Sequence, residues 1–435
     1  MIFTTCPPAA RRRIVLRAAA LAMGLALSGC AEFAQHPAAP APAAATGTAP
    51  VTAPAPAPAA PPQAAAPPSP PPILPYADAV MNAANTLLTS ASEASRSPVK
   101  IPLIVDPLID GMTGVQTLAT QSMGEQLVRL VREKYPQFEV ERFNAASVAR
   151  QPFVLIGTLT PVNKQRQTTG QREAYRICLA MADLKTGKLV SKGLAFAQMQ
   201  GVDATPTPFF REVPAWTEDP ATLGYIRTCQ GTKAGDPINA LYVDRIVAAA
   251  LISDAIDAYN AGRYRESLDL YVAAQRTPGG DQFRTYSGLY LAHLKLGQRD
   301  AAVQAFGQLV DYSLQTKRLA VKFLFRPGST AFVQDPKVTG IYPVWIKEIA
   351  VRARNRDACL EVVGHTSPTG PEPLNQRLSL LRAEYIRDRL ISDAPTLKNR
   401  TIANGVGSSA TLVGTGKDDA SDALDRRVEF KVVGC

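Results

Sequence analysis

The stretch that decides the fold of the C-terminal part of the chain reads CLEVVGHTSPTG over residues 359–370 and PLNQRLSLLRAEYIRDRL over residues 373–390. The first run is apolar and then turns polar and rich in turn residues, which predicts a buried strand followed by a loop. The second run has Leu378, Leu381 and Tyr385 near helical spacing, which predicts a helix. Together they form a strand–loop–helix unit.

Further elements are predicted on both sides of this unit. A strand over residues 321–325 and a helix over 341–354 precede it, and strands over 401–404 and 425–432 follow it. The resulting order is βαβαββ, which is typical of a mixed sheet with helices on one face. We therefore expect an α+β domain over residues 319–435.

Four ordered motifs in this segment resemble the OmpA-like peptidoglycan-binding domain. They are Gly364-His365-Thr366 with Gly370, Asn375 with Leu378-Ser379 and Arg382-Ala383, Gly405 with Gly407, and Asp425-Arg426-Arg427-Val428-Glu429. The resemblance covers residues 319–435 and implies the fold of that family for them.

The resemblance also implies a ligand, the diaminopimelate of the peptidoglycan stem peptide, whose side chain ends in an ammonium and a carboxylate on one carbon. An arginine suits the carboxylate because its planar guanidinium binds bidentately. In the family, a loop aspartate and a helix arginine share these roles. Arg382 falls at the arginine position and Ser367 at the aspartate position. By the same resemblance, Thr366, Asn375 and Arg426 are candidate contacts.

Ser367 departs from the family pattern because serine carries no charge. A charge-assisted hydrogen bond contributes about 1.5–3 kcal/mol against about 1 kcal/mol for a neutral one, so binding would weaken roughly tenfold or more. Glu372, five residues further along, is our candidate for a compensating carboxylate. The alternative is a domain that keeps the fold but binds peptidoglycan weakly or binds something else. We interpret His365 as structural.

The first thirty residues are typical of an export signal. Four arginines within residues 11–17 precede a short apolar run over 18–27, too short to cross a bilayer. Leu27-Ser28-Gly29-Cys30 resembles the bacterial lipobox, which implies removal of residues 1–29 and lipidation of Cys30. A plain cleavage site or a free cysteine is the alternative. By resemblance to enterobacterial sorting, Ala31 favours the outer membrane, so we expect an acyl anchor.

Residues 30–75 are predicted to form a long disordered spacer. Fifteen of the 36 prolines fall between residues 37 and 75, where no residue is charged. This composition cannot bury a core and favours extended polyproline II, which reaches at most roughly 120 Å at about 3.1 Å per residue. The spacer is either a passive linker or a tether that carries the folded part away from the membrane.

The charge and hydropathy of the chain exclude some classes of protein. The net charge falls from +10 to +6 without the four signal arginines, which is too modest to indicate nucleic acid as a partner. After the signal, no stretch has 18 consecutive apolar residues, which argues against a multi-span membrane protein. Hydrophobic residues make up 46%, which favours folded cores over wholesale disorder.

The segment over residues 76–239 combines one predicted helix with several strands. Periodicity predicts strands over 101–105, 138–143, 153–159, 175–182 and 189–197, and a helix over 117–135. Between the last two strands, Asp183-Leu184-Lys185-Thr186-Gly187-Lys188 predicts a hairpin turn. We expect an α+β sheet with helices on one face. Residues 101–110 and this hairpin loosely resemble the N-terminal domains of CsgG-like, FlgO-like and LpoB-like outer-membrane lipoproteins.

Residues 240–318 are predicted to be helical and contain a repeat. Gly262-Arg263-Tyr264 returns 35 residues later as Gly297-Gln298-Arg299, and Tyr271 returns as Phe306. This pattern resembles tetratricopeptide repeats. Two units are fewer than usually stand alone, so we expect packing on a neighbouring domain. The repeat is either a groove for a protein partner or a structural spacer.

Four cysteines remain besides Cys30 and the one in the signal. Cys178 and Cys229 share one predicted segment, and Cys359 and Cys435 share another. Two intradomain disulfides are our hypothesis, because such pairs are typical of an oxidising compartment. No CxxC pair is present in the sequence, so zinc chemistry has no support.

The sequence contains few residues that could form a catalytic site. The three histidines are His36, His293 and His365, which leaves little for a catalytic triad or a histidine metal site. We therefore expect no enzyme activity, no catalytic residue, no cofactor and no metal.

The sequence as a whole indicates an outer-membrane lipoprotein that faces the periplasm and tethers the envelope to the wall. Its partners would be peptidoglycan, the outer membrane through its lipid, and possible proteins through residues 76–318, without nucleic acid. The alternative is an accessory or scaffold lipoprotein of an envelope assembly or secretion machine, with weak or lost peptidoglycan binding because of Ser367.

Overall fold

Two β-sheets organise the part of the chain described by the structure, a computed structural model: residues 70–95, 98–170, 172–326, 328–414, 416 and 425–435. The predicted signal peptide, Cys30 and most of the predicted spacer lie outside these residues. Residues 68–435 cluster into one compact unit. Within the described ranges, no helix has the length and apolar character needed to cross a membrane.

The first sheet has the strand order β1-β7-β6-β5-β2-β4, with β3 beside β5. Its strands are β1 (Ile73–Leu74), β2 (Ile101–Val105), β3 (Ile109–Asp110), β4 (Phe138–Glu141), β5 (Phe153–Val162), β6 (Ala174–Asp183) and β7 (Lys188–Gln198). β6 and β7 pair antiparallel across the predicted hairpin, where Gly187 has a φ of +69°. Glycine adopts this left-handed conformation without steric cost.

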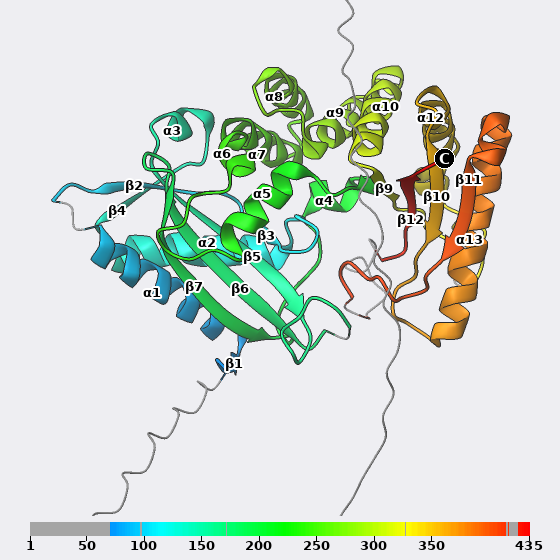
Figure 1. Cartoon of the computed structure of the whole chain (residues 1–435). Coiled ribbons are helices and arrows are strands. Elements are labelled where there is room, and N and C mark those ends of the chain that lie inside the picture. Colours follow the sequence, from blue (N-terminus) through cyan, green and yellow to red (C-terminus); the bar gives the residue numbers. More distant parts are fainter. Residues whose placement is uncertain (1–69, 96–97, 171, 327, 415, 417–424) are drawn as a thin grey trace, which may run out of the picture. The chain divides into compact units, whose positions relative to one another are not determined.

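Helices cover both faces of the first sheet, not one face as we expected (Figure 1). One face packs on α1 (Tyr76–Ala94) and α2 (Leu118–Lys134). The other packs on α5 (Pro220–Cys229), α6 (Ala240–Val243) and α7 (Ile246–Asn260). The reason lies in the strands: in β6, Ile177 and Leu179 enter the first core and Cys178 and Ala180 enter the second. A strand without a polar face needs cover on both sides.

The helical segment forms two helix pairs that share one kind of turn. The helices are α7, α8 (Tyr264–Arg276), α9 (Phe283–Lys295) and α10 (Arg299–Gln315). Gly262 between α7 and α8 and Gly297 between α9 and α10 have φ values of +76° and +72°. Tyr271 and Phe306, the repeated aromatics, are both fully buried. The sequence repeat therefore corresponds to a structural repeat.

The second sheet has the strand order β11-β10-β12-β9-β8. Its strands are β8 (Ala215–Trp216), β9 (Arg318–Val321), β10 (Cys359–Gly364), β11 (Thr401–Gly405) and β12 (Val428–Val433). With α12 (Tyr342–Asn355) and α13 (Glu372–Asp393), the chain order from β9 onward is the predicted βαβαββ. The remaining short helices are α3 (Ala145–Ala149), α4 (Pro208–Glu212), α11 (Pro336–Thr339) and the 3₁₀ turn Pro395–Asn399.

Two features of the second sheet differ from the prediction. β9 ends at Val321 rather than at residue 325, and the rings of Phe323 and Phe325 instead pack on Phe332 with ring centroids 5.7 and 5.2 Å apart. The sheet also gains β8, which pairs antiparallel with β9. One hydrophobic core then runs from Phe209 to Phe430 and includes the helical segment.

Both pairs of cysteines considered in the sequence lie within bonding distance. Cys178 is joined to Cys229 and Cys359 to Cys435, with Cα atoms 6.2 and 5.4 Å apart. The second bond follows from strand register, because β10 and β12 are antiparallel and Cys359 lies opposite Val433. The first bond joins β6 to α5, and the second joins β10 to the residues that follow β12.

Candidate functional site

The first, third and fourth motifs lie at the same end of the second sheet, and the second motif lies on α13, which follows the loop of the first. β10 and β11 are parallel with Gly364 opposite Gly405, and β10 and β12 are antiparallel with Gly364 opposite Val428. Val428 in turn lies opposite Val321, the last residue of β9. The chain after β9, β10 and β11 and the chain before β12 therefore meet at one edge, although they are distant in sequence.

Backbone hydrogen bonds join the loop after β10 to the turn after β11. The Thr366 N–H donates to the Gly407 carbonyl at 2.9 Å, and the Gly407 N–H donates to Ser379 Oγ on α13 at 2.9 Å. A side chain at Gly364 would lie 1.9 Å from the Ser379 carbonyl oxygen. The glycines of the first and third motifs thus allow the strands to approach α13 closely.

The first turn of α13 is attached to both loops. The Asn375 side-chain amide donates to the carbonyls of Thr369 and Gly370 at 3.2 and 3.5 Å. The Glu372 carboxylate accepts from the Ser408 N–H at 3.1 Å and from the Ser408 hydroxyl. Glu372 is exposed, and its hydrogen bonds orient the Gly-rich turn.

Arg382 lies about two helical turns after Asn375 on α13. It is 6% exposed. Its Nε and Nη2 donate to the carbonyls of Ser329 and Arg326 at 3.1 and 3.2 Å, and its guanidinium lies 4.8 Å from the Phe325 ring centroid. The arginine singled out by sequence is therefore oriented by the loop that follows β9.

The other candidate residues lie in the same loops. Ser367 and Thr366 are 6% and 4% exposed. The Thr366 hydroxyl is buried and has no hydrogen-bond partner among the described residues. Arg426 is half-buried in the stretch that leads into β12. The structure thus brings Thr366, Ser367, Asn375, Glu372, Arg382 and Arg426 to one end of the sheet.

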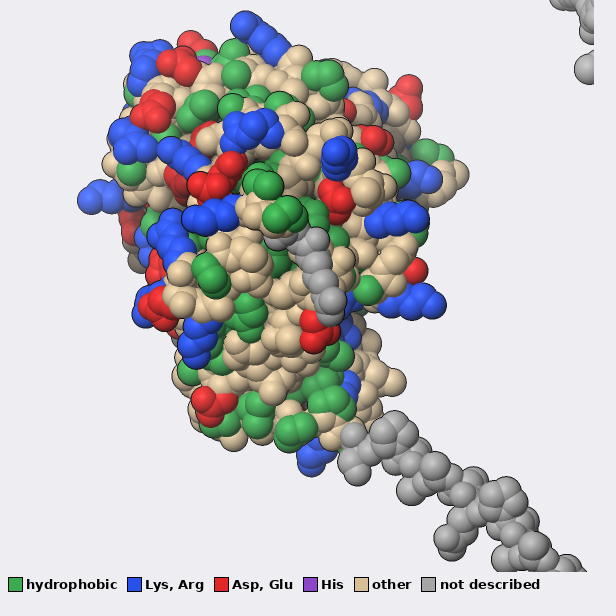
Figure 2. All heavy atoms as spheres, turned by 90° about the vertical axis from the view of Figure 1, so that its left-hand side faces the viewer, with side chains coloured by type: hydrophobic (Ala, Val, Ile, Leu, Met, Phe, Trp, Pro, Cys, Tyr) green, Lys and Arg blue, Asp and Glu red, His purple; other side chains and the backbone are tan. Residues whose placement is uncertain are grey.

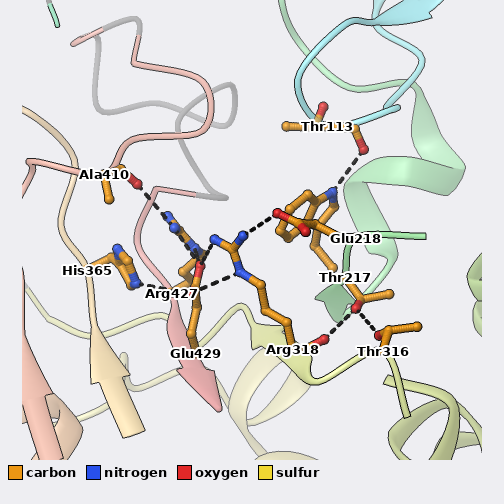
Figure 3. A network of polar contacts seen from close by, with 10 residues as sticks. Thr113, Thr217, Glu218, Thr316, Arg318, His365, Ala410, Arg427 and Glu429 are labelled. Atoms are coloured by element: carbon orange, nitrogen blue, oxygen red, sulfur yellow. Dashed lines mark hydrogen bonds and ion pairs between the residues drawn. The ribbon is translucent and has the colours of Figure 1, made fainter. Parts of the chain in front are cut away.

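A buried charge network next to this end was not predicted as a unit (Figure 3). Glu429 on β12 is fully buried, and its carboxylate binds Arg427 Nη2 at 2.7 Å and Arg318 Nη2 at 2.9 Å. Arg318 reaches Glu218 at 2.6 Å with its other terminal nitrogen, and its guanidinium lies 5.1 Å from the Trp216 ring centroid. Two arginines therefore share one buried carboxylate.

The electrostatics of this network keep its carboxylate ionised. Burial by itself raises the pKa of Glu429, but nearby His365 and the guanidinium groups of Arg427 and Arg318 hold that pKa well below its ordinary value. Burial lowers the pKa of His365 to about 4, against an opposing effect of Glu429. Because this pKa lies well below 7, His365 is neutral at neutral pH, and its Nε2 lies 3.6 Å from the Glu429 carboxylate.

Asp425 has a related structural role in the fourth motif. It is fully buried and accepts N–H groups from Leu412, Val413 and Gly414 at 2.6, 3.0 and 2.7 Å. No role for Asp425, Glu429 or Arg318 follows from the sequence pattern alone. Charged residues in a strand normally indicate a solvent face, so only their membership of the motif could have indicated burial.

The described residues contain no cluster of three or more His, Cys, Asp or Glu side chains arranged to hold a metal ion. On the face shown in Figure 2, basic and acidic side chains are intermixed. Mixed charges of this kind do not create a strong field of one sign on that face.

Comparison with known proteins gives limited matches. No family model matches the sequence. Outer membrane porin F of Pseudomonas fluorescens is 38% identical over 73 residues, which are 17% of this chain and 22% of the porin. The chain thus spans about a fifth of the length of this curated relative.

Solved structures similar to the chain cover about a quarter of it. The cell wall anchor of the T6SS from Pseudomonas aeruginosa is 22% identical, with 27% of this chain and 81% of that chain covered and a TM-score of 0.23. The peptidoglycan-associated lipoprotein from Burkholderia pseudomallei is 22% identical, with 26% and 89% covered and a TM-score of 0.22. The OmpA-like domain of FopA1 from Francisella tularensis is 19% identical, with 26% and 71% covered and a TM-score of 0.21.

Proposed function

We propose that this chain is a cell-envelope protein that binds the stem peptides of peptidoglycan at the loop end of its second sheet. The observation that carries the proposal is the meeting of four separate motifs at that end, with Arg382 buried beside them. Convergent polar groups on loops held by a rigid sheet are typical of binding sites.

The chemistry of the ligand assigns roles to individual side chains. Diaminopimelate presents a carboxylate and an ammonium on one carbon, and a planar guanidinium suits the carboxylate. The carbonyls of Arg326 and Ser329 fix the plane of the Arg382 guanidinium, so Arg382 would meet the carboxylate with little loss of side-chain entropy. Asn375 holds the loop, and Arg426 adds positive charge nearby.

The ammonium would be accepted by hydroxyl oxygens rather than by an aspartate. The Thr366 hydroxyl is buried without a partner among the described residues, and Ser367 is next to it in the chain. A buried hydroxyl with no hydrogen bond is costly unless a ligand or water completes it. Compensation by Glu372 would require its carboxylate to leave Ser408, so we expect Glu372→Gln to weaken sacculus binding less than loss of Arg382.

The location follows from the N-terminal sequence and is part of the proposal. Cys30 would carry the acyl anchor, and residues 30–75 would span from the outer membrane toward the wall. The curated relative is an outer membrane protein by name, and two disulfides suit an oxidising compartment. Noncovalent attachment of the envelope to the wall would result.

The test is binding of residues 68–435, which form one compact unit, to purified diaminopimelate-containing sacculi. We expect Arg382→Leu to lower the fraction of protein that sediments with sacculi by about tenfold or more. Arg377→Leu is the matched control, because Arg377 is exposed on the same helix. Melting temperatures of both variants separate a binding defect from unfolding.

Two results would reject the proposal. The first is no binding of the wild-type protein, and the second is equal loss of binding for Arg382→Leu and Arg377→Leu. Either result would favour the accessory or scaffold function, in which residues 76–318 bind a protein partner. The core shared by the helical segment and the second sheet is compatible with that rival.

A further inference from the structure

A polar cavity that shares no lining residue with the loops of the candidate site lies between the first sheet and the helical segment. Its walls come from the end of β2 and from α5, α6, α7 and α9, and the lining residues include Asp106, Gln116, Tyr242, Arg245, Gln282 and Arg284. It has about 40 Å³ of space for the centres of water-sized atoms, room for about three water molecules. Only a small ligand fits.

The position in the sheet is one where ligands commonly bind. β2 is parallel to β4 on one side and to β5 on the other, and Asp106 directly follows β2. In sheets with parallel strands, ligands bind outside the carboxyl ends of two neighbouring strands whose onward connections run in opposite directions. The cavity opens at this point of the first sheet.

Asp106 is a buried carboxylate with one oxygen left for a ligand. It is 6% exposed, and its Oδ2 accepts the Tyr242 hydroxyl at 2.8 Å. Its Oδ1 makes no hydrogen bond with any described residue. Burial raises the pKa of Asp106 to about 7, although Tyr242 and Arg284 oppose that change. An ammonium group at Oδ1 would supply the missing compensation.

Two guanidinium groups line the same cavity. Arg284 donates from Nη2 to the Gly114 carbonyl at 2.6 Å, with its guanidinium 5.5 Å from the Phe210 ring centroid. Arg245 donates from Nη1 to the Leu241 carbonyl at 3.4 Å, which is a weak contact. Among the described residues, this is the only hydrogen bond of the Arg245 side chain. Most of its N–H donors are therefore left for a ligand. A carboxylate is the group that such donors select.

We propose that this cavity binds a free small α-amino acid as a zwitterion, with its ammonium on Asp106 and its carboxylate on Arg245 and Arg284. A ligand with only one of these charges would leave the opposite wall uncompensated, which is unfavourable in a buried site. The site is separate from the peptidoglycan proposal and does not depend on it.

The test is isothermal titration calorimetry of residues 68–435 at pH 8 with four probes: glycine, L-alanine, acetate and methylamine. This pH lies above the pKa of about 7 for Asp106 and so favours its ionised form. We expect glycine or L-alanine to bind at least about tenfold more tightly than acetate or methylamine, because only the amino acids satisfy both walls. No binding by either amino acid, or acetate or methylamine binding as tightly, would overturn the proposal.

Matched variants show whether the cavity is responsible. Asp106→Asn and Arg245→Gln should each weaken glycine binding about tenfold or more. Asp244→Asn and Arg276→Gln are the controls, because both residues are exposed and lie outside the cavity. Circular dichroism checks folding, and Arg245→Gln remains informative if Asp106→Asn does not fold. Equal affinity in the cavity variants and the controls would also overturn the proposal.

Discussion

Two buried carboxylates in this chain occupy opposite electrostatic situations. Glu429 in the second sheet is bound by Arg427 and Arg318, so its pKa lies well below the ordinary value. Asp106 in the first sheet has a tyrosine hydroxyl as its side-chain hydrogen-bond donor, so burial raises its pKa to about 7. Both are less than 10% exposed. Burial alone therefore does not decide the charge of a carboxyl group; the donors around it do.

The difference separates a structural site from a site prepared for a ligand. Around Glu429, both carboxylate oxygens have basic partners, and Arg318 also binds Glu218, which follows β8. Asp106 lines a cavity, and its Oδ1 has no hydrogen bond with any described residue. A buried polar network in which every group has a partner favours one specific fold. A buried polar group without a partner is stabilised only when a ligand or water binds to it.

The largest effect is expected from breaking the Glu429 network. Glu429→Gln leaves the buried Arg427 guanidinium without its carboxylate and removes one of the two carboxylate partners of the half-buried Arg318, which should lower the free energy of unfolding by about 3–5 kcal/mol. Urea unfolding of residues 68–435 measures this change. Glu384→Gln is the control, because Glu384 makes no hydrogen bond with any described residue. A loss for Glu429→Gln no larger than the control's would contradict the role of the network.

Asp106 should respond in the opposite direction at high pH. Its folded pKa of about 7 exceeds the unfolded value, so the folded state binds a proton more tightly and wild-type stability falls as pH rises through this range. Asp106→Asn removes that dependence. The free energy of unfolding of Asp106→Asn, relative to that of the wild type, should rise by about 3 kcal/mol between pH 5 and pH 8. Urea titrations at both pH values check this, with Asp244→Asn expected to show no such gain.

The buried imidazole of His365, next to Glu429, gives a further test of how burial affects a titratable group. Its folded pKa of about 4 is below the unfolded value, so its contribution is present above pH 6.5 and is lost as pH falls toward 4. Between pH 7 and pH 5, the free energy of unfolding of His365→Gln should therefore fall by about 2 kcal/mol less than that of the wild type. His293→Gln, in the helical segment, is the control. Identical pH dependence of wild type and His365→Gln would disprove the assignment.

The smallest effect is a gain of binding at the candidate peptidoglycan site. Ser367→Asp adds a carboxylate beside the buried Thr366 hydroxyl, and a charge-assisted hydrogen bond should strengthen sacculus binding about tenfold. Sedimentation with sacculi measures this gain. Ser409→Asp, an exposed serine in the neighbouring turn, controls for added charge. If Ser367→Asp binds no better than the control, the serine is not the weak point of the site.

The sequence predicted the order of elements from residue 319 onward and the hairpin of the first sheet, because these depend on local periodicity and turn residues. It did not predict α1, whose buried positions are largely alanine and give a weak periodic signal. β8 has two residues and depends on β9, about a hundred residues later. Strand pairing at that distance has no local signal.

The candidate sites were predictable to different degrees for the same reason. Arg382 and Ser367 follow from an ordered motif, but the carbonyls that orient Arg382 come from a loop more than fifty residues earlier. Asp106 stands before a proline at the end of a strand, where sequence indicates only a turn. Its burial depends on Tyr242, 136 residues away, so only the folded chain shows a cavity there.

The pairing of β8 with β9 has a practical consequence for work on residues 319–435 alone. A fragment that starts at residue 319 would lack Ala215 and Trp216 and would present β9 as an open edge. Unprotected sheet edges pair with other chains and promote aggregation, and the apolar surface of α12 that faces the helical segment would also be uncovered. The short strand therefore covers part of the outer edge of β9.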